Sequence, residues 1–173
     1  MTIIDTPRLR LRPWNDMDAP ELYELARDPR IGMLCGWKPF ECIDDAHEAL
    51  STVLAAPDSY AVTLASTGEI VGSIALRIDA DSPEASVADI GYWIGSPYWG
   101  NGYATEAGHA IIERARELGV STIILKYFDG NEASRRVSEK LGFTWRSREE
   151  DVEHPLIGQR LTVHRTELAL TAR

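Results

Sequence analysis

The most constraining feature of this 173-residue chain is a strand-like run that ends in a glycine turn and continues directly into a helix-like segment. The run 88–94 is aromatic and β-branched, which is typical of a strand. Asn101-Gly102 is also a common hairpin turn, but from Ala104 to Leu118 the apolar residues recur at helical spacing. Glycines followed by a helix N-terminus present free N–H groups to an anion, so this segment predicts a phosphate site.

A second segment, Asn131–Phe143, contains an Asn-x-x-Ser pattern and ends in Lys-Leu-Gly-Phe. Trp99–Ala104 resembles the acetyl-coenzyme A signature Gln/Arg-x-x-Gly-x-Gly/Ala of the Gcn5-related N-acetyltransferase (GNAT) superfamily, and the second segment resembles its Asn-x-x-Ser helix. The opening Thr6–Trp14 is similar to the first strand of the RimJ/RimL ribosomal-protein N-terminal acetyltransferase branch. The resemblance extends from Thr6 to about Leu170, with Trp99 where the pattern has Gln or Arg.

The chain is therefore expected to be α+β (α/β), a single-domain GNAT fold that spans residues 1–173. We expect a mixed, mostly antiparallel sheet of about seven strands with a central parallel pair, and about four helices. The expected strands are Leu9–Pro13, Tyr60–Leu64, Ile70–Ile78, Ser86–Ile94, Thr122–Tyr127, Phe143–Asp151 and Leu161–Leu170. The expected helices are Ala19–Arg27, one that is capped by Asp44 and runs to Ala56, Ala104–Leu118 and Glu132–Leu141, with a loop at Gly32–Phe40.

Composition narrows the range of partners. A net charge of −9 argues against binding to nucleic acid or an anionic membrane, and favours either a cationic acceptor or plain solubility. We expect no leader and no membrane helix, since no apolar stretch approaches the ~18 residues that a span requires. Cys35 and Cys42 form no metal or redox motif, and the four histidines are scattered. We expect a cytoplasmic protein without a metal.

The resemblance implies that acetyl-CoA enters between the two parallel strands. Its pantetheine arm would pair with backbone near Trp93 and Ile94, and its pyrophosphate would lie on the N–H groups of residues 99–105. The expected cofactor-binding residues are Trp93, Ile94, Trp99, Gly100, Asn101, Gly102, Tyr103, Ala104, Thr105, Asn131 and Ser134. Three bases of the expected helix Glu132–Leu141 would either reach the 3′-phosphate or be solvated: Arg135, Arg136 and Lys140.

Two residues are candidates for proton transfer. Asp89 lies on the strand that leads to the glycine turn, where some relatives have a catalytic glutamate, so it is the candidate base; the alternative is a structural carboxylate or one that orients water. Ser134 matches the serine that some RimL-type relatives place near the sulfur, and its alternative is a hydroxyl that bonds backbone. Ser138 stands where many relatives have a tyrosine acid.

The acceptor groove is less defined. The resemblance places it at Gly32–Phe40 and at roughly Glu149–Gln159, with Trp37 and Phe40 as walls or as core. Four acids would attract an amine or form a solvated strand end: Glu149, Glu150, Asp151 and Glu153.

The expected function is direct acetyl transfer from acetyl-CoA to a primary amine, such as a protein N-terminal α-amine. A small-molecule amine (polyamine, aminoglycoside or amino-acid derivative) and a non-catalytic acyl-CoA sensor are the alternatives, and a homodimer stays open.

Overall fold

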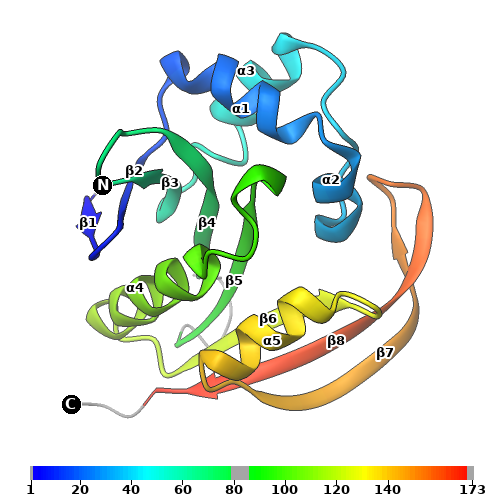
Figure 1. The fold of residues 1–173 in the computed structure, drawn as a ribbon. Coiled ribbons are helices and arrows are strands. Elements are labelled where there is room, and N and C mark those ends of the chain that lie inside the picture. The colour runs from blue at the N-terminus through cyan, green and yellow to red at the C-terminus, as the bar shows by residue number, and fades with distance from the viewer. Residues whose placement is uncertain (1, 79–85, 171–173) are drawn as a thin grey trace.

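The computed structural model describes residues 2–78 and 86–170, and within these ranges eight strands form one mixed sheet (Figure 1). The strand order is β1-β2-β3-β4-β5-β6-β8-β7, and every neighbouring pair is antiparallel except β5 and β6. The strands are β1 (Ile4–Asp5), β2 (Leu9–Pro13), β3 (Ser59–Leu64), β4 (Ile70–Ile78), β5 (Val87–Ile94), β6 (Thr122–Phe128), β7 (Thr144–His154) and β8 (Gln159–Ala169). The fold class and the central parallel pair are therefore confirmed, with one strand more than the seven expected.

Five α-helices lie in the described ranges, one more than the four expected. They are α1 (Ala19–Ala26), α2 (Pro29–Cys35), α3 (Ile43–Ser51), α4 (Tyr103–Glu117) and α5 (Glu132–Lys140), with short 3₁₀ turns η1 (Asp16–Asp18) and η2 (Ser96–Tyr98). Figure 1 shows α4 and α5 as neighbours over the sheet and α1 and α3 as a separate pair. None of the helices in the described ranges is long and apolar enough to cross a membrane.

The additional helix α2 occupies part of the segment that was expected to be a loop. Asp28-Pro29 ends α1, as the sequence indicates, but it also begins the next helix. Pro29 occupies the first turn, where a missing N–H costs nothing, and the Asp28 side chain accepts a hydrogen bond from Arg30 N–H at 3.0 Å. Gly36 then ends α2 with φ of +83°.

The boundaries of α3 also differ from the expectation. Cys42 rather than Asp44 is the N-cap, because the Asp45 carboxylate accepts the N–H groups of Glu41 (2.6 Å) and Cys42 (3.1 Å). The helix ends at Ser51 instead of Ala56. The Thr52 hydroxyl there donates to Glu48 O at 2.6 Å, an alternative to continued helical bonding.

Two apolar clusters cover opposite faces of the sheet. The larger one packs α4 against the sheet through residues such as Leu11, Ile90 and Ile111. The smaller one joins α1 and α3 and includes Trp93, which is on the other face because neighbouring strand residues point in opposite directions. The two faces of β5 therefore meet different helices.

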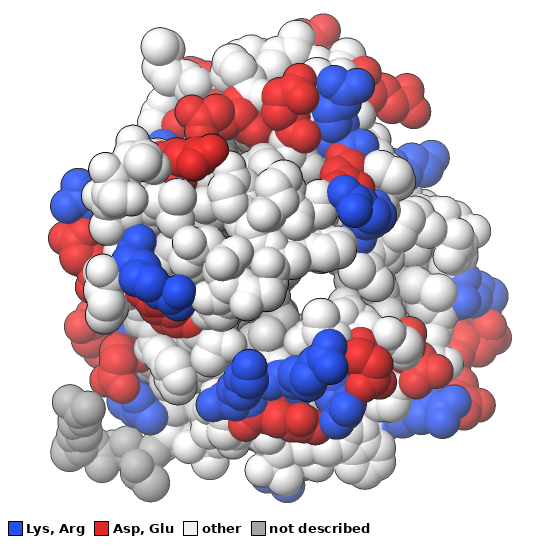
Figure 2. All heavy atoms as spheres, viewed as in Figure 1, with Lys and Arg blue, Asp and Glu red and all other residues white. Residues whose placement is uncertain are grey.

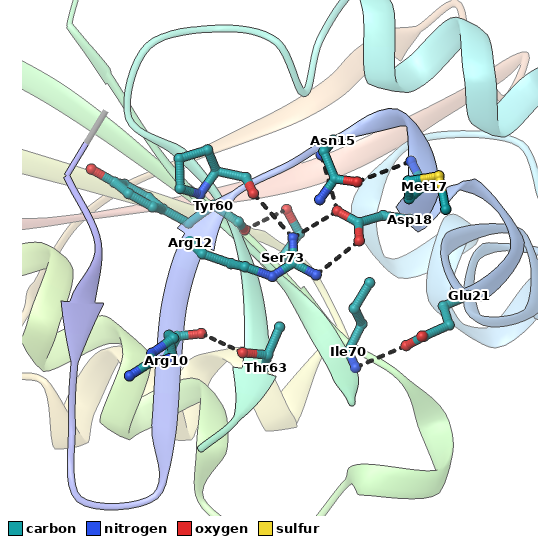
Figure 3. A network of polar contacts seen from close by, with 11 residues as sticks. Arg10, Arg12, Asn15, Met17, Asp18, Glu21, Tyr60, Thr63, Ile70 and Ser73 are labelled. Atoms are coloured by element: carbon teal, nitrogen blue, oxygen red, sulfur yellow. Dashed lines mark hydrogen bonds and ion pairs between the residues drawn. The ribbon is translucent and has the colours of Figure 1, made fainter. Parts of the chain in front are cut away.

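A partly buried ion pair fastens the N-cap of α1, Asp18, to the sheet (Figure 3). The Arg12 guanidinium on β2 donates twice to Asp18, at 2.7 and 2.8 Å, and the Asn15 N–H donates to the same carboxylate at 3.0 Å. Glu21 of α1 accepts the N–H of Ile70 on β4 at 3.1 Å. These bonds hold α1 at a fixed position above β4, where it forms one wall of the groove described below.

Candidate functional site

The central feature of the site is a gap between the two parallel strands. Pairing of β5 with β6 ends at Ile90 and Leu125, whereas β5 stays paired with β4 up to Ile94 and β6 stays paired with β8 up to Phe128. Each strand thus follows its outer neighbour, and the two separate. Within the described residues the backbone edges that face this gap have no strand partner.

The pairing pattern determines which backbone groups face the gap. Gly95 N–H donates to Val71 O of β4 at 2.8 Å. In an antiparallel pair every second residue bonds to the same neighbour, so Trp93 also directs its N–H and C=O to β4. Tyr92 and Ile94 direct theirs to the gap. The N–H groups that are free to bond a ligand in the gap are therefore those of Tyr92 and Ile94. The backbone of Trp93 is paired with β4, and its indole lies on the face of the sheet that α1 and α3 cover.

A groove of about 920 Å³ includes this gap and extends over both faces. Figure 2 shows an opening just above α5, with basic side chains gathered below it. The groove is lined by most of the residues expected from the sequence, namely Asp89, Trp93, Ile94, Trp99, Gly100, Gly102, Tyr103, Ala104, Thr105, Asn131 and Ser134. Asn101 is not among its lining residues. The Asn101 amide turns back to donate to Tyr98 O (3.0 Å) and Trp99 O (3.3 Å).

The glycine turn has the geometry that the sequence indicates. Gly100 and Gly102 have φ of +81° and +79°, where side chains other than glycine are strained. Gly102 is the N-cap of α4, and the first bond of that helix runs from Glu106 N–H to Gly102 O at 3.0 Å. The N–H groups of residues 103–105 therefore have no carbonyl one turn earlier and point toward the groove at the positive end of the helix dipole.

Trp99 has a structural explanation. Its indole Nε1 donates to Ile94 O at 2.6 Å, which ties the turn to the end of β5. This bond occupies the Ile94 carbonyl, which faces the gap, and leaves the Ile94 N–H free to bond a ligand there. A Gln or Arg at this position would have to hold the turn in another way.

Ser134 of α5 takes part in the N-terminal cap of the helix and also lines the groove. Asn131 Oδ1 accepts the Ser134 N–H at 3.1 Å, and the Ser134 Oγ accepts a hydrogen bond from the Tyr92 hydroxyl at 3.0 Å. Burial raises the pKa of Tyr92 to about 12, so the phenol keeps its proton. Among the described residues no acceptor takes the Ser134 hydroxyl proton, which is thus available to the groove.

Ser138, in contrast, is structural. It is buried, its hydroxyl donates to Arg135 O at 2.8 Å, and it is not a lining residue of the groove. In the family resemblance, position 138 is the one where many relatives have a tyrosine, so a phenol was sought only there. Tyr92, on the adjacent strand, supplies a phenol that sequence reasoning missed; its alternation with Ile90 and Ile94 was the one signal that could have found it.

Asp89 lies on the opposite face of β5 from Tyr92. Its carboxylate is 3.6 Å from the Arg77 guanidinium of β4 and 3.7 Å from the Lys126 ammonium of β6. Burial raises the pKa of Asp89, and this effect outweighs the opposing influence of Lys126 and Arg77. A carboxyl group with a raised pKa is a stronger base than an exposed one.

The three bases of α5 have different surroundings. Arg135 is held along the helix by Glu132 at 2.7 Å and by Glu139 at 2.5 Å. Arg136 and Lys140 line the groove instead. Of the three residues named from the sequence, these two are positioned to meet an anion there.

The face of the groove that carries Asp89 is aromatic. Trp37 lies with its ring centroid 5.5 Å from Phe40 and 6.3 Å from Trp93, and all three rings line the groove while packing on α1 and α3. Both alternatives for Trp37 and Phe40, wall and core, are therefore realised together.

The acids of β7 do not line the groove. Asp151 accepts from Arg160 at 2.6 Å and Glu150 lies 3.1 Å from Arg148, and both acids are exposed where the pairing of β7 with β8 is irregular. These acids are therefore no wall of the groove, and their exposure and pairing favour the alternative of a solvated strand. His154 and Leu156 contribute to the lining from this region instead.

Comparison with known proteins agrees with this geometry. The family model "Acetyltransferase (GNAT) domain" matches residues 8–144. The chain belongs to the GNAT acetyltransferase family. It is 29% identical over 147 residues to the uncharacterized N-acetyltransferase YoaA of Bacillus subtilis strain 168, and the match covers 82% of each protein.

Two solved acetyltransferase structures share the fold. One is the microcin C7 self-immunity acetyltransferase MccE in complex with acetyl-CoA and AMP, with a TM-score of 0.81 and 22% identity over 95% of this chain and 94% of that one. The other is RimL, the ribosomal L7/L12 alpha-N-protein acetyltransferase, with a TM-score of 0.81 and 20% identity over 98% and 94%.

Proposed function

We propose that this chain, as a single acetyltransferase domain, transfers an acetyl group directly from acetyl-CoA to a primary amine. The observation that carries this proposal is the gap between β5 and β6, with a carboxylate on one face and a hydroxyl donor on the other. Two reactants that enter from opposite faces can meet there in an oriented pair, which supplies much of the rate.

The residues present fit acetyl-CoA. The turn 100–105 offers N–H groups to a pyrophosphate, and its two positive-φ glycines leave no side chain between the backbone and the anion. Arg136 and Lys140 line the same groove and suit a further phosphate. The N–H group of Ile94, the nearer of the two to the turn, suits an amide of an extended pantetheine arm. In this proposal Asn101 contributes backbone only.

Bound acetyl-CoA supplies an activated acyl group as a thioester. Asp89 takes the proton that the amine loses as the N–C bond forms. The backbone N–H of Tyr92, the free N–H nearer to Ser134, stabilises negative charge on the carbonyl oxygen. Ser134, held by Tyr92, donates its hydrogen bond to the sulfur as the C–S bond breaks. No residue needs to carry the acetyl group, since amine and thioester approach each other directly.

The identity of the amine is a choice between two classes. The fold shared with RimL supports a protein N-terminal α-amine. The aromatic wall of Trp37, Phe40 and Trp93 supports a small molecule that is enclosed by the groove. A non-catalytic acyl-CoA sensor is disfavoured, because the pair of Tyr92 and Ser134 supplies the donor that Ser138 does not.

A two-part experiment tests the proposal. Calorimetric titration of acetyl-CoA into the folded protein should show saturable binding. Release of free CoA should then rise well above background hydrolysis with at least one member of a panel of amines: a peptide with a free N-terminus, spermidine, an aminoglycoside and an amino acid. Binding without release on any of them would support the sensor instead.

A further inference from the structure

The charge of the groove is opposite to that of the chain. The whole sequence has a net charge of −9. The charged residues that line the groove, within the described part of the chain, are four bases and one acid: Arg77, Lys126, Arg136, Lys140 and Asp89. An acceptor selected by the groove therefore meets a potential that the overall composition does not reveal.

These four bases divide into two pairs. Arg136 and Lys140 lie on α5, on the side that the proposed function gives to the phosphates of acetyl-CoA. Arg77 is the register partner of Asp89 across β4 and β5, and Lys126 lies two residues beyond Ile124, which is the partner of Asp89 across β5 and β6. Arg77 and Lys126 thus share the face of Asp89, where the amine would enter.

The absence of a side chain at Gly91 leaves room for Arg77 close to the gap. A Cβ atom on Gly91 would lie 2.8–3.2 Å from the Arg77 guanidinium, which is closer than Cβ contacts normally allow. The guanidinium therefore lies directly over the backbone of β5, one residue before Tyr92. Any other residue at position 91 would displace it from the point where β5 and β6 separate.

One carboxylate does not satisfy two cations here. The distances from Asp89 to Arg77 and Lys126 are 3.6 and 3.7 Å, longer than direct hydrogen bonds, and the side chains of Arg77 and Lys126 are 66% and 53% exposed. The three groups together carry one excess positive charge, and this excess grows when Asp89 accepts a proton. A polyamine or aminoglycoside would add further positive charge at the same point.

We propose, building on the function proposed above, that the acceptor is an α-amino acid with a free carboxylate. Its amine faces Asp89, its carboxylate lies above Asp89 within reach of Arg77 and Lys126, and an apolar side chain lies against Trp37, Phe40 and Trp93. The adjacent carboxylate neutralises the excess charge, and the aromatic rings bury the rest of the molecule.

The test compares acceptors that differ mainly in this one group. We would measure kcat/KM by CoA release for L-phenylalanine, L-phenylalanine amide, phenethylamine and spermidine with the wild-type protein. The expected result is a preference for phenylalanine of roughly tenfold or more over the amide and phenethylamine, and a larger one over spermidine. An equal or better rate with the amide, phenethylamine or spermidine would overturn the inference and leave the proposed function intact.

Two variants test whether Arg77 and Lys126 cause the preference for an acceptor with a carboxylate. Arg77→Gln and Lys126→Gln lie on different strands, so failure of one to fold leaves the other as the test. Each should reduce the preference for phenylalanine over its amide severalfold, with the affinity for acetyl-CoA unchanged. Arg148→Gln is the matched control, because Arg148 is paired with Glu150 and is not a lining residue of the groove. A preference that persists in both groove variants would overturn the inference.

The failure of the proposed function would be seen separately. If acetyl-CoA binds and none of these compounds, nor a peptide or aminoglycoside, releases CoA, then both the function and this inference fall. If a peptide N-terminus alone is acetylated, the function stands and the inference is overturned.

Discussion

The two faces of the groove are built in different ways. The face proposed for the cofactor relies on backbone: the turn 100–105, the N–H groups of Tyr92 and Ile94, and a helix N-terminus. The face proposed for the acceptor relies on side chains from distant parts of the chain, among them Trp37 and Arg77. A backbone site depends on the path of the chain and tolerates many residue types. A side-chain site depends on each residue.

The largest effect is expected at the backbone face. Gly102→Val should abolish measurable acetyl-CoA binding, because a branched residue strains the φ of +79° and stands between the backbone and the pyrophosphate. Calorimetry with acetyl-CoA measures the loss. Gly68→Val is the matched control, since Gly68 has the same φ of +79° in the β3–β4 turn with open space around it. Both variants should lose similar stability, and only the first should lose binding.

The next effect is expected on the other face. Asp89→Asn should lower turnover by about 10²–10⁴-fold, the usual contribution of a positioned base, with acetyl-CoA affinity nearly unchanged. Because the pKa of Asp89 is raised in the folded protein, the wild-type rate should fall as the pH drops through a value above 3.8. This acidic limb should be absent from the pH–rate profile of the variant. A profile of unchanged shape would make Asp89 a structural residue.

The same substitution has a predictable effect on stability. A carboxyl group whose pKa is raised on folding binds its proton more tightly in the folded state. Its contribution to stability is therefore present at low pH and is lost as the pH rises through the raised value. Asp89→Asn should make the protein more stable than wild type near neutral pH, with the difference vanishing in acid. Thermal unfolding at several pH values measures this difference.

A smaller effect should appear where the two faces meet. Ser134→Ala should reduce kcat by roughly tenfold, since one hydrogen bond to a charged group is worth ~1.5–3 kcal/mol. Tyr92→Phe should reproduce part of that loss through Ser134, so the double variant should be no slower than Ser134→Ala alone. Tyr60→Phe, which removes a buried phenol bonded to Asp58 outside the groove, should leave kcat unchanged. Additive losses would mean that Tyr92 acts independently.

The smallest effect is expected at Ser138. Ser138→Ala should leave kcat unchanged and cost about 1 kcal/mol of stability, because the hydroxyl donates to Arg135 O and Ser138 is not part of the groove lining. Ser138→Tyr should destabilise the protein, because the site is buried and has no room for a phenol. A gain in turnover from that substitution would show that position 138 does reach the sulfur.

The contrast between a backbone site and a side-chain site also explains which features could be predicted from the sequence. The glycines, the helical spacing after them and the Asn-x-x-Ser pattern are local, and these local patterns suffice to locate β5, α4, α5 and the turn between 99 and 105. Helix α2 was missed, because Asp28-Pro29 is as typical of a helix end as of a helix start. Tyr92, Arg77 and Lys126 were missed because their roles depend on register between strands, which spacing along one strand does not contain.

The most direct test is a crystal structure of the protein with CoA bound. We expect the pyrophosphate to lie on the N–H groups of residues 100–105. We also expect the thiol sulfur to lie within hydrogen-bond distance of the Ser134 hydroxyl, on the face of β5 opposite Asp89. A sulfur atom placed on the Asp89 side, or a pyrophosphate bound away from this turn, would contradict the division of the groove into two faces.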